Sequence, residues 1–397
     1  MERQILHVDV NNAFLSWTAV ERLKNGETED IRNIEAVIGG DEEKRTGVVL
    51  AKSIKAKEKG VTTGEPLFSA RKKCRNLKTF SPDFKVYKYY SDKLYELLSE
   101  YTDVIERFSI DECFLDLTHS LMGRKLMDIA YEIKNRAKEE LGFTVNIGVA
   151  NNKLLAKMAS DFKKPDMVHT LYKEEIESKM WNLPVNELFM LGRKSSMKFN
   201  SMQIRTIGDL AKTDRDRIYK KFGKNGIKMW EYANGIDTSQ VESKEPLPKG
   251  IGNSVTLPKD ISGAKEIIPV IAALVEKVMY RLRAYNMQAT TVNVQLKTKD
   301  FEVYSHQKSF TSPTDSTIDV LNLAKQIYKE MDKDYIVRLV GVRVDKLSKK
   351  ENMQLSLFDN QIKKENNIDK VMDSLNNKFG YSTVKRATDM QVDIDLK

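Results

Sequence analysis

Three acidic residues stand where the sequence predicts the ends of buried strands. Asp9 lies at the end of the apolar run from Ile5 to Val10, and Asp111 and Glu112 are adjacent between two further apolar runs. A carboxylate at the edge of a buried strand is costly unless a cation or hydrogen bonds compensate its charge. Acids from two neighbouring strands can hold two hard cations ~3.5 to 4 Å apart, with the main-chain carbonyl of Val10 as a further ligand. That arrangement suits in-line attack at phosphorus, although a polar turn and a helix-leading cap fit the same spacing.

The first of these acids is followed by a predicted helix over residues 13–24, which Asn12 is expected to cap. The backbone N–H groups of Asn12, Ala13 and Phe14 then lie at a helix N-terminus, which is a natural seat for phosphate oxygens. Phe14 would lie beside the group attached to a triphosphate, where its ring leaves no room for a ribose 2′-hydroxyl. A core position for Phe14 beneath Trp17 fits the pattern as well.

The elements that must position these residues alternate between strands and helices. Their order in the first part of the chain is β-α-β-β-α-β, which is ferredoxin-like, with residues 13–82 inserted after the first strand. Strands are predicted at residues 5–10, 104–110, 113–117 and 144–150, and helices at residues 87–100, 126–141 and 153–162. The insertion holds the helix over 13–24, a strand at 48–50 and a basic helix at 53–59.

The rest of the chain predicts a helical region, a linker and a second mixed domain. Short helices broken by glycines occupy residues 171–235, and the proline-containing stretch 241–250 is typical of a linker. Strands are predicted at residues 254–257, 290–298, 304–311 and 336–344, with helices at 264–285 and 318–332 covering one face of their sheet. The expected fold class is therefore α+β, spread over several domains.

Length and composition limit the class of protein. The 397 residues are 41% hydrophobic and 31% charged, which predicts two to four globular domains at ~100 to 200 residues each. The longest apolar stretch is far shorter than the ~20 residues that cross a bilayer, and the N-terminus lacks the pattern of a secretory signal. We therefore expect a cytoplasmic protein with no membrane partner. Cys74 and Cys113 cannot build a disulfide framework or a zinc site, so reduced thiols are expected.

Basic residues are concentrated in two separate segments. Residues 44–78 carry eleven Lys and Arg against two acidic side chains, and residues 190–228 carry eleven against three. The net charge of +9 is a weak pointer by itself, and one such segment alone fits a solvated helix face equally well. The two segments together favour a polyanionic partner.

Three motifs carry more specific information. The first is Asp9-Val10-Asn11 followed by Phe14, and the second is Ser109-Ile110-Asp111-Glu112 with Phe114-Leu115-Asp116. The third runs from Gly148-Val149-Ala150-Asn151-Asn152-Lys153 through Ala156-Lys157 to Lys164-Pro165. In this order and at these intervals they resemble the palm motifs of the Y-family DNA polymerases, the translesion enzymes of the DNA polymerase IV and V types. The resemblance extends from about residue 4 to residue 348.

The resemblance implies a metal site and a residue that discriminates between the sugars of incoming nucleotides. Asp9, Asp111 and Glu112 would be the ligands of two Mg²⁺ ions, and Val10 would add a main-chain ligand. Phe14 would be the residue that discriminates between deoxyribose and ribose.

The resemblance also implies contacts to the triphosphate of an incoming deoxynucleotide. Lys164 would contact the triphosphate directly. Lys57 stands where the family usually has Arg, and a lysine neutralises phosphate without the bidentate grip of a guanidinium. Ile54 occupies the place of a tyrosine that usually helps to hold the phosphates, and Ser53 is assigned to compensate for it. Thr18 stands where a glutamate is common, a departure from which no effect is predicted.

The implied fold is a right hand. The palm would comprise residues 1–12 and 83–170, the fingers residues 13–82, and the helical thumb residues 171–240. A linker at residues 241–249 would lead to an α+β little finger at residues 250–348 and then to a tail at residues 349–397. The thumb departs from the family, because Met190-Leu191-Gly192-Arg193 has one glycine where a helix-hairpin-helix often has glycine-x-glycine.

A short peptide in the tail suggests a protein partner. Gln354-Leu355-Ser356-Leu357-Phe358 resembles the pentapeptide by which bacterial polymerases bind the sliding clamp. Its polar flanks leave the three apolar side chains without an obvious core, so a groove on a partner is the expected destination. A short strand packed on the little finger is the alternative. Beyond it, residues 368–379 have the spacing of an amphipathic helix of unknown role.

The leading hypothesis is a template-directed DNA polymerase that adds deoxynucleotides to a primer by two-metal phosphoryl transfer, opposite damaged template. Primer-template DNA, deoxynucleoside triphosphates and a sliding clamp are its expected partners. A nucleotidyl cyclase also uses paired acids on a ferredoxin-like sheet but needs no cationic thumb or clamp peptide. The second alternative is a non-catalytic factor that binds DNA or the clamp and has kept the fold. Asp9-Val10-Asn11 and the C-terminal extension lean towards the polymerase V type without deciding between the two branches.

Overall fold

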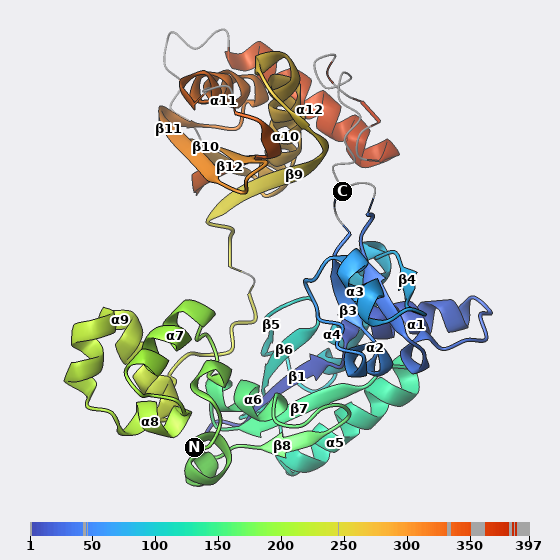
Figure 1. Cartoon of the computed structure of the whole chain (residues 1–397), viewed down its shortest axis with the longest axis vertical. Coiled ribbons are helices and arrows are strands. Elements are labelled where there is room, and N and C mark those ends of the chain that lie inside the picture. Colours follow the sequence, from blue (N-terminus) through green and yellow to red (C-terminus); the bar gives the residue numbers. More distant parts are fainter. Residues whose placement is uncertain are drawn as a thin grey trace. The chain divides into compact units, whose positions relative to one another are not determined.

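The computed structural model describes residues 2–42, 45, 47–244, 246–331, 335–350, 362–380, 383, 384 and 386. The chain divides into two compact units, which Figure 1 shows coloured along the sequence. The N-terminal unit comprises Met1–Gly40 and Val48–Glu245, and the C-terminal unit comprises Asp41–Gly47 and Pro246–Lys397. The boundary at residues 245 and 246 falls within the stretch that the sequence marks as a linker.

A five-stranded sheet forms the centre of the N-terminal unit (Figure 1). Its order is β5 (Ile105–Arg107), β6 (Glu112–Asp116), β1 (Ile5–Val10), β7 (Val145–Ala150) and β8 (Val168–Thr170). The pairs β5–β6, β6–β1 and β1–β7 are antiparallel, and the pair β7–β8 is parallel. The predicted ferredoxin-like order is confirmed, while the short edge strand β8 was not predicted.

Helices cover both faces of this sheet. They are α4 (Phe84–Ser99), α5 (Leu126–Arg136), which continues as a π-helical turn (Ala137–Leu141), and α6 (Lys153–Ser160). Because successive side chains of a strand alternate between faces, Leu6, Val8 and Val10 of β1 join the core beneath α4 and α5. His7 and Asp9 point to the opposite face, where α6 packs. The alternation of β1 therefore aims Asp9 at α6.

The segment inserted after β1 has its own small core. It begins with α1 (Ala13–Lys24) and holds a three-stranded sheet and two short helices. The sheet order is β3 (Val49–Lys52), β2 (Ala36–Gly39) and β4 (Lys78–Phe80), and the helices are α2 (Ile54–Glu58) and α3 (Leu67–Lys73). A short 3-10 helix (Ile31–Asn33) precedes β2. Strands β2 and β4 are buried or partly buried runs of three or four residues that the sequence pattern did not reveal.

The last part of the N-terminal unit is helical, as predicted. Its three α-helices are α7 (Arg193–Ser201), α8 (Ile207–Lys212) and α9 (Arg215–Ala233). Shorter turns precede them at Lys173–Glu175, Ile176–Met180 and Val185–Glu187. Helix α9 is kinked at Gly223, whose positive φ of 61° lies outside the helical region. The side chains of this part share one core with α6, which ties it to the sheet.

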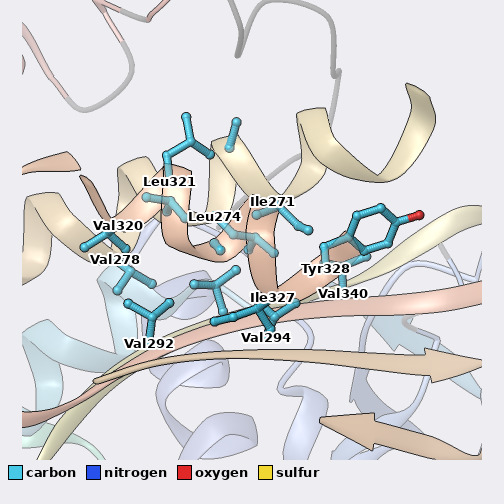
Figure 2. Packing of buried hydrophobic residues seen from close by; sticks show 14 of the residues in the cluster. Ile271, Leu274, Val278, Val292, Val294, Val320, Leu321, Ile327, Tyr328 and Val340 are labelled. Atoms are coloured by element: carbon cyan, nitrogen blue, oxygen red, sulfur yellow. The ribbon is translucent and has the colours of Figure 1, made fainter. Parts of the chain in front are cut away.

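The C-terminal unit is an antiparallel four-stranded sheet covered by helices. Its order is β11 (Val303–Thr314), β10 (Met287–Thr298), β12 (Val337–Lys349) and β9 (Gly250–Ile261). The strands are longer than predicted, because cross-strand pairing extends into polar residues. Helices α10 (Ala264–Ala284) and α11 (Thr317–Met331) pack on one face, as expected. Figure 2 shows the interlocking side chains of this core, among them Ile271, Leu274, Val278, Val292, Val294, Val320, Leu321, Ile327, Tyr328 and Val340.

The predicted C-terminal amphipathic helix exists as α12 (Ile362–Phe379), but its apolar side chains do not explain how it docks. Met372 is buried, whereas Ile368 and Phe379 are exposed. The docked face is instead polar: the Arg283 guanidinium of α10 bonds the Asp373 carboxylate at 2.5 Å and lies 3.5 Å from Asp369. Ion pairs between α10 and α12 therefore hold this helix in place.

Among the helices that the structure describes, none combines the length and the apolar character needed to cross a membrane.

Candidate active site

Asp9 and Glu112 are opposed residues on the neighbouring strands β1 and β6. Opposed residues of an antiparallel pair point to the same face of the sheet, which here is the face that α6 covers. Asp9 is only 6% exposed, and the Glu112 side chain is 18% exposed. The sheet register therefore brings two of the three predicted acids together in a half-closed site.

The main chain of Asp111, and not its side chain, contacts the end of β1 beside this pair. Its carbonyl oxygen accepts a hydrogen bond from the Val10 N–H at 3.0 Å, which fixes the backbone at the end of β1. Its carboxylate, however, accepts a hydrogen bond from Ser109 Oγ at 2.6 Å. The backbone of the three acids thus lies together at the ends of β1 and β6, while one oxygen of the Asp111 carboxylate bonds Ser109.

Two lysines compensate the charge of the acids. Lys157 of α6 places its Nζ 3.2 Å from Asp9 Oδ2 and 2.8 Å from Glu112 Oε1. Lys164, which follows α6, places its Nζ 3.0 Å from the other oxygen of Asp9. Both lysines also contact Asp161, at 3.3 and 2.9 Å. Within the described ranges, no set of three or more His, Cys, Asp or Glu side chains is grouped closely enough to hold a metal ion.

Burial and these lysines set the protonation of the site. Burial raises the pKa of Asp9 to about 6, although Lys164 and Lys157 favour its ionised form. Burial also disfavours ionised Glu112, but the hydrogen bond and the charge of Lys157 oppose it, and the Glu112 pKa lies below its ordinary value. For Lys157, burial disfavours the ammonium form, and the charges of Asp9 and Glu112 reverse that effect and raise its pKa. Lys157 and Glu112 are therefore a charged pair at neutral pH.

His7 lies behind the acids and is completely buried. Its Nδ1 is 2.8 Å from Ser160 Oγ, and its Nε2 is 3.7 Å from Glu112 Oε2. Ser160 Oγ donates its only proton to the Lys157 carbonyl, so it accepts a hydrogen bond from the His7 Nδ1–H. Burial lowers the pKa of His7 to about 4, which keeps the ring neutral at neutral pH.

Two buried amides attach the Lys164 loop to the sheet. Asn146 of β7, opposed to Asp9 across the strand pair, donates to the carbonyls of Ser160 and Lys163 at 3.0 and 2.8 Å. Asn11 donates to Asn146 Oδ1 at 3.1 Å and accepts a hydrogen bond from the Asp166 N–H at 2.9 Å. These bonds bracket Lys164 and hold it next to Asp9.

The start of α1 lies directly after the acid strand, as predicted, but Asn12 does not cap the helix. Asn12 has left-handed backbone angles, and its side chain makes no cap hydrogen bond. Its Nδ2 instead donates to the Lys52 carbonyl of β3 at 2.8 Å, which joins the inserted segment to the end of β1. The first-turn N–H groups of Ala13 and Phe14 thus lack a capping side chain.

Phe14 packs in the aromatic core, one of the two positions that the sequence left open, and its place beside a nucleotide stays a prediction. Its ring stacks on Tyr87 with the centroids 4.6 Å apart and also lies near Trp17, at 6.3 Å. The side chain is nevertheless only partly buried, one turn of chain after the acids. Phe14 is packed on one side and accessible on the other.

Two predicted phosphate contacts belong to the inserted segment, and they differ in exposure. Lys57 is exposed on α2. Burial lowers the pKa of Lys52, and the nearby charge of Lys57 lowers it further, so the two cations repel each other. Ser53 is 1% exposed, and its Oγ caps α2 by accepting the Ala56 N–H at 3.1 Å, beside a second bond from Ala36. Ser53 is therefore a helix cap, and its assignment to phosphate binding stays a prediction.

Several site residues were missed from the sequence. Lys157 lies within the third motif, but no role was predicted for it. It is a lysine within the apolar run of α6, a pattern that indicates a buried charge with a partner. His7 stands two residues before Asp9 and therefore shares its face of the strand. The roles of Asn11 and Asn146 depend on contacts between distant segments, which no local pattern reveals. The clamp peptide Gln354-Leu355-Ser356-Leu357-Phe358 lies outside the described residues.

Comparison with known proteins agrees with this geometry. Residues 8–161 match the model of the impB/mucB/samB family, and residues 248–357 match the model of the C-terminal domain of that family. A curated protein of Clostridium acetobutylicum named DNA polymerase IV is 47% identical over 388 residues, which are 98% of each chain. The DNA polymerase IV 2 of Bacillus subtilis is 36% identical over 98% of this chain and 95% of its own.

Solved structures share the fold. A Y-family DNA polymerase chimera of Dbh and Dpo4 has a TM-score of 0.77 at 24% identity, over 87% of this chain and all of that one. A Dbh ternary complex has a TM-score of 0.60 at 23% identity, over 86% of this chain and 98% of that one. The lean of the sequence towards the polymerase V type is wrong, because the curated relatives that match almost the whole chain carry the name DNA polymerase IV. The chain belongs to the impB/mucB/samB family of Y-family DNA polymerases, in its DNA polymerase IV branch.

Proposed function

We propose that the chain is a template-directed DNA polymerase that extends a primer with deoxynucleotides and copies damaged template. The observation that carries the proposal is the pairing of Asp9 with Glu112 across β1 and β6, next to Asp111, in a chain that matches DNA polymerase IV relatives over nearly its whole length. Neither the cyclase nor the non-catalytic factor is favoured by any feature of the site.

The acids fit divalent metal by their chemistry. Carboxylate oxygens are the donors that Mg²⁺ prefers, and Asp9, Glu112 and Asp111 with the Val10 carbonyl would supply them to two ions. When bound, the ions supply positive charge that lowers the pKa of the primer 3′-hydroxyl and neutralises the leaving pyrophosphate. The rest of the reaction is positioning, which the residues of this chain provide.

The incoming deoxynucleotide would be held between the end of β1 and the inserted segment. We assign its phosphates to Lys164, to Lys57 and to the backbone N–H groups of Asn12, Ala13 and Phe14 at the start of α1. An anion bound near Lys52 and Lys57 would offset the repulsion between their positive charges, so we add Lys52 to this group. Phe14 would stack beneath the sugar and exclude a 2′-hydroxyl.

The duplex would be held by charge. We assign residues 1–12 and 83–170 to the palm, 13–82 to the fingers, 171–240 to the thumb, 241–249 to the linker and 250–348 to the little finger. The cationic segments 44–78 and 190–228 then belong to the fingers and the thumb, where they would bind phosphates with little regard to sequence. In the tail, residues 354–358 would dock on a sliding clamp, and the chain would act in the cytoplasm, where bacterial DNA lies.

Primer extension tests the proposal. Asp111→Ala should abolish Mg²⁺-dependent extension of a primed template, because the third carboxylate is lost, while the melting temperature stays near that of the wild type. Asp92→Asn, which removes a partly exposed acid of α4 that pairs with Lys88 and Arg107, is the matched control and should extend normally. Normal extension by Asp111→Ala would refute the assignment. Product made from nucleotide alone would identify a cyclase, and DNA binding without extension by the wild type would identify a binding factor.

A further inference from the structure

Lys157 is a buried cation that the implied ligand set does not use. Its side chain is 10% exposed, and its Nζ contacts Glu112, Asp9 and Asp161 at 2.8, 3.2 and 3.3 Å. The helix that carries it packs directly on Gly148 of β7, so it cannot move closer to the sheet. A β-carbon placed at Gly148 would lie 1.8 Å from the Ala156 carbonyl oxygen. The position of the Lys157 ammonium group is therefore set by the fold.

The ammonium group occupies the point at which a cation contacts both carboxylates. Asp9 and Glu112 lie on the same face of the sheet, and without a cation between them their charges would repel at short range. Lys164 does not replace Lys157, because it contacts the other oxygen of Asp9 and its side chain is 36% exposed. Removing one partner of a buried ion pair leaves an uncompensated charge, so the acids depend on Lys157 when no metal is bound.

We propose that Lys157 is a built-in counter-cation, which holds Asp9 and Glu112 in place before metal arrives and sets how tightly the pair binds a divalent ion. This inference rests on the proposed function, because it takes the same acids as metal ligands. The ammonium group and the metal compete for the same carboxylate oxygens. The free enzyme therefore binds metal weakly, and tight binding waits for the oxygens that an incoming triphosphate adds. Lys157 is in this sense a positioning residue and not a catalytic one.

Metal titration of the full chain without DNA or nucleotide tests the proposal. Mn²⁺ is the probe, and the free ion is counted by electron paramagnetic resonance. Lys157→Met keeps the length of the side chain and removes its charge. We expect this variant to bind Mn²⁺ more tightly than the wild type, by roughly fivefold to about a thousandfold, which is the range for one unit charge removed at ~4 Å between bulk water and a protein surface. Its melting temperature should fall in the absence of metal and recover when Mn²⁺ is added.

Lys153→Met is the matched control. Lys153 lies one turn earlier on α6, with a side chain that is 13% exposed and an Nζ 2.6 Å from Glu106, away from the acids. This variant should also lose stability, but its Mn²⁺ affinity should equal that of the wild type and Mn²⁺ should not restore its melting temperature. Adding Glu112→Gln to Lys157→Met should remove the gain in affinity, which assigns the ion to the paired acids.

Equal Mn²⁺ affinity of Lys157→Met and the wild type would overturn the proposal. If Lys157→Met does not fold, Asp9→Asn is compared with the double variant Asp9→Asn/Lys157→Met, which keeps the charge balance of the site. The double variant should bind Mn²⁺ more tightly than Asp9→Asn, and equal affinity again overturns the proposal. The extension assay separates the two ideas: extension lost in Asp111→Ala with an unchanged Lys157→Met titration removes only the role of Lys157, whereas extension retained in Asp111→Ala removes the proposed function.

Discussion

Phe14 is partly buried in the helix that follows Asp9, and its ring is supported by stacking on Tyr87. Phe14→Ala should open the space that a 2′-hydroxyl needs and admit ribonucleotides. We expect the ratio of kcat/KM for a deoxynucleotide to that for its ribonucleotide to fall roughly 10- to 200-fold, the usual worth of one small group in a tight pocket. Single-nucleotide insertion kinetics measure this ratio.

Phe84→Ala is the control for this prediction. Phe84 lies in the same aromatic cluster, with its ring 6.0 Å from that of Phe14, but it is exposed and does not follow the acid strand. Its replacement should leave the ratio unchanged. A ratio that does not move in Phe14→Ala would make Phe14 a core residue only.

His7 predicts a specific dependence of stability on pH. Its pKa is about 4 in the folded chain and 6.5 ordinarily, so between these values the unfolded chain binds a proton that the folded chain does not. Stability from neutral His7 is therefore complete above pH 6.5 and is lost as the pH falls towards 4, by about 3 kcal/mol. Urea unfolding of the wild type and of His7→Phe should show free energies of unfolding that diverge by this amount across that range.

Asp9 acts in the opposite direction over part of the same range. Because burial raises its pKa to about 6, its contribution to stability is present at low pH and is lost as the pH rises to that value. Asp9 is present in both proteins, so the comparison isolates His7. His119→Gln, at an exposed position of the same unit, is the control. Parallel curves for His7→Phe and the wild type would contradict the prediction.

At the residue scale, the sequence identified the acids but not what surrounds them. Asp9 and Glu112 were predictable because strand ends and family motifs are local patterns. Lys157 was not, because its role depends on α6 crossing the face of β1, a contact between residues 148 positions apart. The capping role of Ser53 was not predicted either, although a serine directly before a helix is a good cap.

At the element scale, strong periodicity predicted the long helices and the central strands. The short strands β2, β4 and β8 were missed, since three or four residues give too little alternation to distinguish a strand from a loop. Helix α12 was predicted for the wrong reason, because its buried face is held by Arg283 and two aspartates and not by its apolar spacing.

The contact between α6 and β7 gives an element-scale prediction. Gly148→Ala would place a methyl group 1.8 Å from the Ala156 carbonyl oxygen, so α6 must move away from the sheet and take Lys157 with it. We expect a loss of about 3 kcal/mol or more in the free energy of unfolding, at the upper end for overpacking, and a fall in extension rate at temperatures where the variant stays folded. Urea unfolding and primer extension measure the two effects.

Gly341→Ala is the matched change in a strand. A β-carbon there would lie 3.3 Å from the Ser254 side chain, a contact that small shifts relieve, so both stability and extension should stay close to those of the wild type. If Gly148→Ala were as mild, the tight packing of α6 on β7 would not be what positions Lys157.

At the scale of the whole molecule, the paired acids and the proposed clamp peptide lie in different parts of the chain. The acids belong to the N-terminal unit, and the peptide at residues 354–358 follows the last strand of the C-terminal unit. We therefore expect that mutations can remove clamp binding without removing primer extension. A polymerase that binds DNA mainly through phosphates is expected to dissociate readily at physiological salt, so a clamp would raise its output without changing the site.

Leu357→Ala/Phe358→Ala tests this separation. Burial of each side chain in a partner groove is worth about 1.5 to 3 kcal/mol, so the double variant should lose roughly 100-fold or more in affinity for the clamp. Extension on a clamp-loaded template should fall to the level seen without clamp, while extension without clamp should stay within about twofold of the wild type. Ile368→Ala/Val371→Ala, which removes two exposed apolar side chains of α12, is the matched control and should retain stimulation. If the clamp still stimulates extension by Leu357→Ala/Phe358→Ala, the clamp contact lies elsewhere. If this variant loses extension without clamp, the tail takes part in catalysis as well as in clamp binding.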